Sequence, residues 1–429
     1  MYLFPRSPRN YGRALTAALC LAVLSFSLPA AGGDSTETKK GKPDTPPSKE
    51  GILDTLFWAP EILVEADRIG HEEDLMSRSG FSAVVTLSSR RHRVEDAASI
   101  LSRSVGVRVR RYGGIGSFAT MSIRGSSSSQ VQFYLDGVPL NDPYSGVTDL
   151  NDISTGDLDR IEIYRGTSPT GFGGSSIGGT VNLVTTAYGN AGPQSWLEAH
   201  GYSGSLGTLR LTAAVRSPAG PVSLRLGGGY LESMGDFPFT DDNGTPENPD
   251  DDTEALRMNS DFTRWNAAGR LGMAARGFDD LSLNFSAVSR EGGIPGIGSN
   301  QSSTARSERE RRIGYLKLKP SPLAGRKIHI DGTAFYSWTA DRFDDPDGDI
   351  GLLRQSTDNR IVSKGGNIRS RIFVPAARLS MEAFLEGRGE SFLPRDLLPV
   401  PSEGPERKRR TITASASAEL GLIGERLFI

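Results

Sequence analysis

Residues 121–185 decide the fold of this chain. They begin with MSIRG at 121–125, and after four serines they continue as the apolar run VQFYL at 131–135, which DGVP closes at 136–139. A second run, RIEIYRG at 160–166, is followed by GGSSIGGTVNLVT at 173–185. Asp-Gly after a run of β-branched and aromatic residues predicts a tight turn, because glycine accepts positive φ without a Cβ clash. The stretch therefore predicts short strands joined by glycine-bearing turns.

These residues resemble the plug domain of TonB-dependent outer-membrane receptors. The plug of that family carries an Ile-Arg-Gly strand, an Asp-Gly-Val turn, an Arg-Ile-Glu strand ending in Arg-Gly, and a terminal Gly-Gly-x-x-Asn-x-x-Thr. Here the four pieces lie in the same order at 123–125, 136–138, 160–166 and 178–185. The sequence departs from the pattern at Thr167, where proline is usual, and at Phe172, where tyrosine is usual. A generic β-domain would explain the turns but not the order of the pieces.

Composition excludes several other classes of protein. The 429 residues carry a net charge of −2, so no overall basic field points to nucleic acid. A single cysteine, Cys20, excludes a disulfide scaffold and a cysteine metal site. The four histidines are scattered without metal-binding spacing, and no nucleophile motif or phosphate loop is found. The sequence therefore predicts that the protein is not an enzyme.

The first 66 residues predict an exported protein with a segment that binds a partner protein. Residues 1–32 have the pattern of a signal peptide, with three early arginines, an apolar core at 14–28 and small residues at 29–32. No other long apolar run exists, so a membrane would be crossed by strands. Residues 33–60 are polar and proline-bearing, which predicts a flexible periplasmic tether. The next segment resembles the TonB box, whose residues would be Glu61, Ile62, Leu63, Val64, Glu65 and Ala66.

Such a β-prone segment at the end of a tether can add as a strand to the sheet edge of a partner. The alternative is that it forms the first strand of the plug domain, which we expect at 67–190. Within that domain, apolar spacing at 94–101 predicts a helix, and the alternating valines at 105, 107 and 109 predict a strand.

The resemblance also implies positions for functional residues. By their place in the plug, the candidates for substrate contact at its apex are Gly116, Ser117, Phe118, Asn141, Asp142, Pro143, Tyr144 and Ser145. Four charged residues are expected to form ion pairs that hold the plug to the barrel: Arg124, Arg160, Glu162 and Arg165.

Residues 191–429 change to two-residue alternation of apolar and polar side chains, as in LRLTAAVR at 209–216. Short turns are expected near 217–221, 277–280, 320–325 and 375–377, and long polar loops near 235–260, 292–307, 342–356 and 392–406. This order is typical of an outer-membrane β-barrel, which has short turns on one side and long loops on the other. The fold class expected is an α+β plug domain inside a transmembrane antiparallel β-barrel. About ten strands are counted, whereas plugged barrels have about 22, so 191–429 would be the N-terminal part of an incomplete barrel.

Two acidic segments in the expected loops could hold calcium through carboxylate oxygens. The candidate ligands in the first are Asp241, Asp242, Asp250 and Asp252. Neither segment has the spacing of a helix-loop-helix calcium site, and a solvated acidic loop is the alternative. No other cofactor is expected.

The resemblance implies active uptake of a scarce nutrient complex across the outer membrane of a Gram-negative bacterium. The expected partners are TonB with its inner-membrane complex, a small metal complex as substrate, and outer-membrane lipid. Ferric siderophores and cobalamin are equally compatible substrates. A signalling receptor would carry a folded domain before the TonB box, for which residues 33–60 are too few. A passive porin or an adhesin needs neither a plug nor a TonB box.

Overall fold

The computed structural model describes residues 82–87, 96–113, 116–156, 158–173, 176–185, 195–325, 327–351, 353–422 and 427–428. The predicted signal peptide, tether and TonB box lie outside these residues. The described part contains a small domain, residues 82–185, and a large antiparallel sheet that begins at Trp196. No helix within it has the length and apolar character needed to cross a membrane.

The small domain is built on a five-stranded sheet in the order β1-β6-β7-β4-β5. Its strands are β1 (Ser82–Thr86), β4 (Val131–Leu135), β5 (Val138–Pro139), β6 (Leu158–Arg165) and β7 (Gly179–Thr185). The β4–β7 pair is parallel, and the other pairs in this sheet are antiparallel. A separate hairpin joins β2 (Val107–Arg111) to β3 (Ala119–Ile123). The predicted strands at 131–135, 160–166 and 178–185 are thus confirmed as β4, β6 and β7.

The turns of this domain follow the predicted chemistry. Asp136 and Gly137, between β4 and β5, have φ of 49° and 86°. Two successive positive φ values define the tight hairpin turn that Asp-Gly favours. Two single-turn 3-10 helices, η2 (Ser128–Gln130) and η3 (Leu150–Asp152), complete the connections.

The predicted helix is present as α3 (Ala97–Ser102), and Asp96 is its N-cap. The Asp96 carboxylate accepts a hydrogen bond from the Ser99 amide at 2.7 Å and is paired with Arg111 at 2.8 Å. Burial raises the pKa of Asp96, but the bonds from Arg111 and Ser99 outweigh it and lower this pKa from 3.8 to about 2. The cap and the ion pair therefore tie α3 to β2.

We expect Asp96→Asn to destabilise α3 by roughly 1 kcal/mol, because asparagine still caps the helix but cannot pair with Arg111. The lowered pKa stabilises the native chain above the ordinary pKa of 3.8, and this contribution disappears as pH falls towards about 2. Hydrogen exchange at the amides of α3, measured between pH 6 and pH 3, checks both points. A pH dependence in the variant equal to that of the native chain would contradict them.

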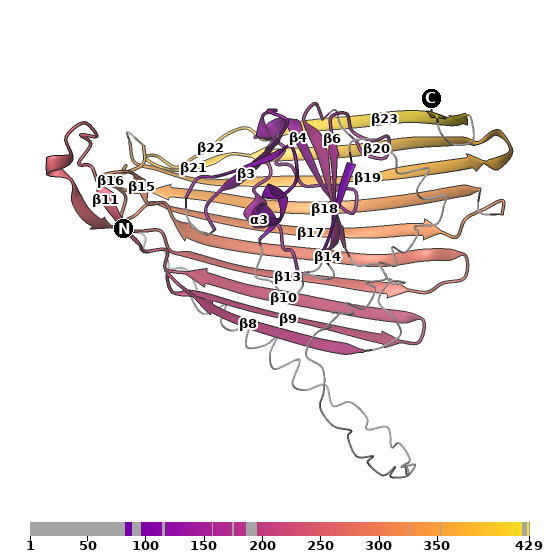
Figure 1. Cartoon of the computed structure of the whole chain (residues 1–429), viewed down its shortest axis with the longest axis horizontal. Coiled ribbons are helices and arrows are strands. Elements are labelled where there is room, and N and C mark those ends of the chain that lie inside the picture. The colour runs from indigo at the N-terminus through magenta and orange to yellow at the C-terminus, as the bar shows by residue number, and fades with distance from the viewer. Residues whose placement is uncertain are drawn as a thin grey trace, which may run out of the picture. The chain divides into compact units, whose positions relative to one another are not determined.

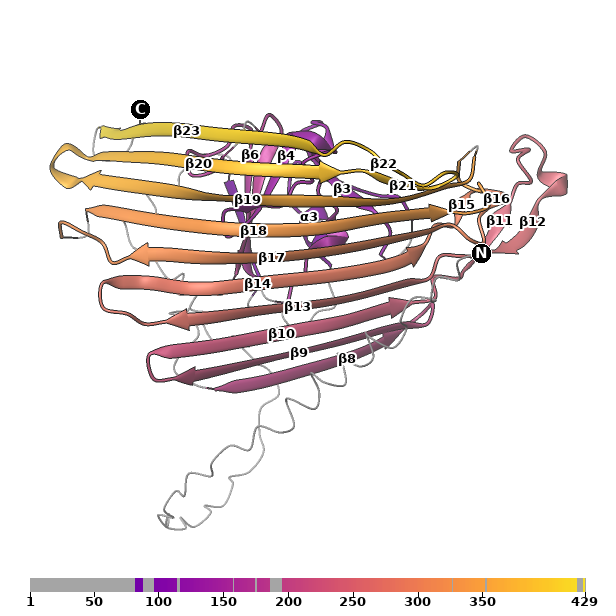
Figure 2. The same cartoon turned by 180° about the vertical axis from the view of Figure 1, so that it is seen from behind.

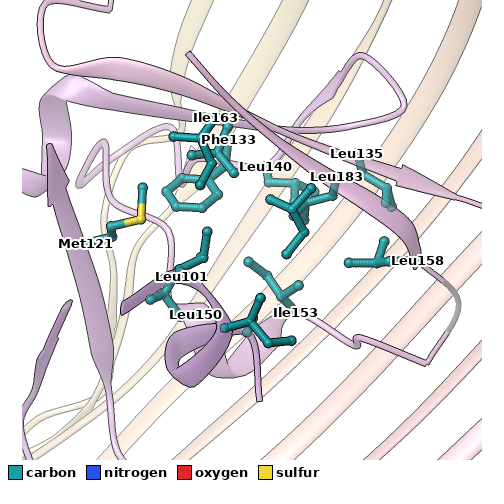
Figure 3. Packing of buried hydrophobic residues seen from close by; sticks show 14 of the residues in the cluster. Leu101, Met121, Phe133, Leu135, Leu140, Leu150, Ile153, Leu158, Ile163 and Leu183 are labelled. Atoms are coloured by element: carbon teal, nitrogen blue, oxygen red, sulfur yellow. The ribbon is translucent and has the colours of Figure 1, made fainter. Parts of the chain in front are cut away.

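The core of the small domain lies between the five-stranded sheet and α3 with η3. Figure 3 shows Leu101 and Leu150 from the helical segments facing Phe133 and Ile163 from the strands, with Met121 beside them. Each of these side chains is at most 3% exposed. Burial of this apolar surface is the main stabilising contribution to the domain.

The large sheet has ten long strands and pairs sequential neighbours throughout. They are β8 (Trp196–Gly204), β9 (Thr208–Ala219), β10 (Val222–Ser233), β13 (Phe262–Met273), β14 (Phe278–Gly293), β17 (Arg306–Pro320), β18 (Ile328–Asp345), β19 (Gln355–Val374), β20 (Leu379–Leu393) and β23 (Arg407–Leu422). A two-residue strand, β24 (Leu427–Phe428), follows β23. The predicted count of about ten is confirmed. In the described residues the sheet is open, with β8 and β24 at its two ends.

The two faces of this sheet differ. The small domain packs on one face, and the other face is uncovered (Figures 1 and 2). On the uncovered face, Leu224, Leu271, Leu283 and Leu316 stand in one row across four strands, and each is at least 38% exposed. Strand alternation places polar residues on the opposite face. An apolar outer face with a polar inner one is typical of strands that meet lipid.

The connections alternate in length nearly as predicted. Short turns follow β9, β13, β17 and β19, the last of them formed by η6 (Pro375–Ala377). Long connections follow β10, β14, β18 and β20. Three of these carry small elements: β11 (Pro238–Asp241), η5 (Pro249–Asp251) and β12 (Thr253–Leu256); β15 (Gly296–Ile297) and β16 (Asn300–Gln301); β21 (Arg395–Leu398) and β22 (Ser402–Glu403). One turn breaks the pattern, because residues 205–207 join β8 to β9 tightly on the long-loop side.

Candidate functional site

The candidate site is the region where the small domain meets the long-loop end of the sheet. Residues 116–118 reach it beside Phe262, the first residue of β13. Gly116 has φ of +81°, and a Cβ there would lie 2.2 Å from the Phe262 ring. Arg290 of β14 donates to the Gly116 carbonyl at 3.4 Å. Gly116 is buried and Ser117 half-buried, whereas Phe118 is 43% exposed. The contact of Gly116 with Phe262 therefore fixes the position of residues 116–118 against the sheet, and the Phe118 ring is their exposed group.

Residues 141–145 form the second segment predicted at the apex. The Asn141 side chain bonds the backbone of Val131, Phe133 and Gly146, so it stabilises the turn. Asp142 is buried and accepts from the amides of Tyr144 and Ser145. Pro143 is half-buried, and Ser145 is exposed.

Tyr144 is the surface group of this second segment. Its ring is 65% exposed and stacks on Phe392, at the end of β20, with centroids 4.5 Å apart and planes at 11°. The remaining residues of the turn are held by their own hydrogen bonds, so the turn presents Tyr144 as a fixed aromatic surface.

One exposed aromatic was missed by the sequence reasoning. Tyr112, 54% exposed, packs against Phe118 with ring centroids 5.4 Å apart, and Arg110 lies over its ring at 4.8 Å. The β2–β3 hairpin brings these three residues together. Two-residue alternation continued beyond Val109 places Arg110 and Tyr112 on the same face of the strand. This pattern in the sequence could have predicted their contact.

Below these surfaces, three aspartates of the small domain meet arginines of the sheet. Asp149 pairs with Arg290 at 2.5 Å, and Asp152 pairs with Arg309 at 2.9 Å. Asp142 approaches Arg309 at 3.3 Å. The side chains of Asp149 and Asp152 are 1% exposed. Burial raises the pKa of Asp152, but the arginines around it, Arg309 first, outweigh burial and lower this pKa. We call these five residues the aspartate–arginine junction.

A second contact lies at the β4–β5 turn. Asp136 accepts hydrogen bonds from the Tyr315 hydroxyl of β17 at 2.7 Å and from the Thr185 hydroxyl and amide at 2.5 and 3.1 Å. Lys317 approaches the same carboxylate at 3.9 Å. One buried carboxylate therefore joins β4, β7 and the large sheet.

Three of the four residues expected to pair with the sheet have contacts within the small domain. Arg160 pairs with Glu162 at 2.8 Å, and Glu162 also accepts from Asn182 of β7. Arg165 donates to the Val105 carbonyl at 2.8 Å, and Arg124 occupies the left-handed region with φ of 51°. Arg160 and Glu162 reach each other because residues two apart on a strand share a face. Ion pairs between the small domain and the sheet are formed by Asp142, Asp149 and Asp152.

Aspartates of the two acidic loops accept hydrogen bonds from groups within their own loops. Asp241 and Asp242 accept from the amides of Asn243 and Gly244, and Asp251 accepts from the Thr245 hydroxyl. In the second loop, Asp345 accepts four backbone amides, from residues 348–351. Among the described residues, no group of three or more His, Cys, Asp or Glu side chains is close enough to hold a metal ion, and Asp250 and Asp252 are not brought together with Asp241 and Asp242 in such a group.

Comparison with protein families identifies the small domain. The sequence model of the TonB-dependent receptor plug domain matches residues 82–180. Residues 82–180 therefore form a plug domain of the kind found in TonB-dependent receptors. The small domain is thus the plug, and the large sheet resembles the barrel wall of these receptors. Over 88 residues the chain is 38% identical to a vitamin B12 transporter, BtuB, of Vibrio cholerae serotype O1 and 36% identical to that of Vibrio vulnificus (strain CMCP6). Each match covers 20% of this chain and 14% of the relative.

Solved structures of a copper transporter and of a siderophore receptor share the fold. The copper transporter OprC aligns with a TM-score of 0.64 and 15% identity, covering 80% of this chain and 52% of that one. The siderophore receptor PirA from Acinetobacter baumannii aligns with a TM-score of 0.63 and 17% identity, covering 82% and 56%. The chain thus spans about half the length of these structures. Both the plug and the sheet enter the alignment, since the plug alone is far less than 80% of the chain.

Proposed function

We propose that the protein takes up a scarce nutrient complex across the outer membrane, with energy supplied through TonB. The observation that carries this proposal is a plug domain that is packed on the polar face of the sheet and presents exposed aromatic rings at the long-loop end. A plug fixed by buried ion pairs closes the passage, so transport needs a partner that moves it. The relatives include vitamin B12, copper and siderophore transporters or receptors, which supports a metal complex as substrate.

Substrate would first bind at the long-loop end. The binding surface consists of the exposed rings of Tyr112, Phe118 and Tyr144, with Arg110 over one of them. Aromatic rings held by packing lose little conformational entropy on binding, and an arginine beside them adds attraction for an anionic or aromatic ligand. The aspartate–arginine junction lies behind this surface, so binding at the apex can bias the attachment of the plug.

TonB would engage Glu61 to Ala66. A β-prone segment binds by adding a strand to the partner, so the backbone amides of this segment supply the affinity. Proline at position 64 removes one such donor and restricts the residue before it. We therefore expect Val64→Pro to abolish uptake while leaving surface binding unchanged, and Val64→Thr, which keeps the amide and the β-branched shape, to retain uptake.

The experiment measures binding and uptake separately in cells that make the protein. Radiolabelled ferric siderophores and cyanocobalamin are the probes, with binding measured in de-energised cells and uptake in energised ones. Tyr144→Ala should weaken binding, and Val64→Pro should block uptake alone. Uptake by Val64→Pro at the rate of the native chain would overturn the role of TonB. Absence of binding and uptake for every probe would overturn the transport proposal.

A further inference from the structure

The register of the large sheet arranges arginines in rows on the face that contacts the plug. In the upper row, Arg210 of β9 is opposite Leu231 of β10, which is opposite Arg264 of β13. Arg264 is opposite Arg290 of β14, which is opposite Arg309 of β17. Four of five consecutive strands therefore place an arginine at the same height.

A lower row repeats the arrangement. Arg216 of β9 is opposite Arg225 of β10, which is opposite Arg270 of β13. On each of these strands, six residues separate the position in the upper row from the arginine in the lower row. Because an antiparallel strand rises about 3.4 Å per residue, the two rows are about 20 Å apart. Six is an even number, which keeps both rows on the plug-facing side.

Small side chains fill the level between the rows. Ala214, Gly227, Ala268 and Ser286 are opposite one another on β9, β10, β13 and β14. Two cavities lie between these strands and plug residues 152–156, each with a volume of about 70 Å³. Such a volume holds a few water molecules but no metal complex. The wall is therefore recessed here, and the plug closes the recess. We call this region, with its two arginine rows, the arginine seam.

The plug masks the positive charge of the upper row. Arg290 and Arg309 pair with plug carboxylates, and Arg264, 7% exposed, donates to the Asn151 carbonyl at 2.8 Å. The Arg264 Nε atom is buried without a hydrogen-bond partner in the described residues. These masking groups come from residues 142–152, and Arg309 also pairs with Asp341 of β18 at 2.8 Å. Movement of that one segment would remove these plug partners from Arg264, Arg290 and Arg309 together.

The lower row contacts both the sheet and the plug. Arg270 pairs with Asp280 of the neighbouring strand at 2.7 Å. Arg225 donates to the Gly156 carbonyl at 3.4 Å, and a carbonyl carries no net charge. The lower row thus adds three arginines, Arg216, Arg225 and Arg270, to the wall of the seam below the aspartates of the plug.

We infer that the arginine seam is the route of an anionic substrate, a complex with carboxylate or phosphate oxygens on its surface. This inference rests on the proposed transport function and adds the charge of the substrate and its path. Arginine binds such oxygens through paired N–H groups, and rows of arginine select anions in pores. As the plug segment leaves, the substrate oxygens replace its carboxylates on the upper row. The small residues between the two rows leave space for the complex. The positive charges of the lower row then attract the complex towards the short-turn side of the sheet.

The experiment is a measurement of ion selectivity that needs neither nutrient nor TonB, so its failure is separate from failure of the uptake test. The protein isolated from the outer membrane is inserted into planar lipid bilayers, and urea is raised on the short-turn side until unfolding of the plug gives conductance. The reversal potential in a KCl gradient then reports the chloride-to-potassium permeability ratio. We expect a ratio above one.

Three variants test the assignment. Arg225→Gln with Arg264→Gln should lower the permeability ratio several-fold, and the lysine pair at the same positions should restore it because lysine keeps the charge. The matched control is Arg312→Gln, since Arg312 lies on the uncovered face of β17 and its side chain is 64% exposed. A cation-selective native channel, or a glutamine pair with the selectivity of the native chain, would overturn the inference.

Discussion

Asp152→Asn should detach η3 from the sheet. The substitution keeps the shape of the side chain but removes the negative charge that Arg309, Arg311 and Arg290 face. Losing one partner of a buried charge network costs about 3–5 kcal/mol, because the remaining charges stay desolvated. Since 1.4 kcal/mol is tenfold in an equilibrium constant, exchange of the amides at 150–153 should accelerate by roughly a hundredfold or more. Hydrogen–deuterium exchange on the protein in detergent measures this.

The control is again Arg312→Gln. Arg312 pairs with Glu310 at 2.9 Å on the exposed face of β17, and such surface pairs contribute about 0–1 kcal/mol. It should leave exchange at 150–153 unchanged. If Asp152→Asn also leaves it unchanged, the aspartate–arginine junction does not hold the plug, and apolar contacts alone would account for its attachment.

Gly179→Ala should prevent β7 from pairing with its neighbours. Gly179 has φ of +151°, and a Cβ would lie 2.4 Å from the Tyr164 carbonyl oxygen and 2.7 Å from Cδ1 of Ile123. The backbone strain costs roughly 1–3 kcal/mol, and the steric overlap costs about as much again. Domains are stable by only about 5–15 kcal/mol, so the substitution removes much of the stability of the plug. Limited proteolysis of the protein in outer-membrane vesicles should show the plug cleaved while the sheet survives.

Gly166→Ala separates the two costs. Gly166 has φ of +104°, but a Cβ there would meet no atom within 4 Å. It should therefore show the strain alone, and its plug should resist protease better than that of Gly179→Ala. Equal sensitivity of the two variants would show that crowding against Tyr164 is not the reason for glycine at 179.

The strands and turns of the plug could be predicted because their signals are local. Asp136-Gly137 forms its turn from two adjacent residues, and β4 and β6 follow from runs of β-branched and aromatic residues. The long strands of the sheet were likewise predictable from two-residue alternation. The position of the expected TonB box, 61–66, lies outside the described residues and stays a prediction.

The aspartate–arginine junction could not be predicted, because its members come from distant parts of the chain. Asp149 and Arg290 are 141 residues apart, and Asp142 and Arg309 are 167 apart. The arginine rows depend on strand register, and a shift of one residue would reverse every side chain. The glycine at 116 gave no sign that Phe262 would occupy the space beside it.

The parallel pairing of β4 with β7 also governs the order in which the plug can assemble. β7 is the last strand of the plug in the sequence, yet it is central in the sheet, between β6 and β4. Until residue 185 has been synthesised, the β1–β6 and β4–β5 pieces have no strand between them. Val131 must meet Gly179 across almost fifty residues, and closing such a loop is slow relative to hairpin formation. The plug therefore cannot complete its sheet before its last strand is available, and a chaperone that holds the nascent chain would have to protect the unpaired edges of β4 and β6 until then.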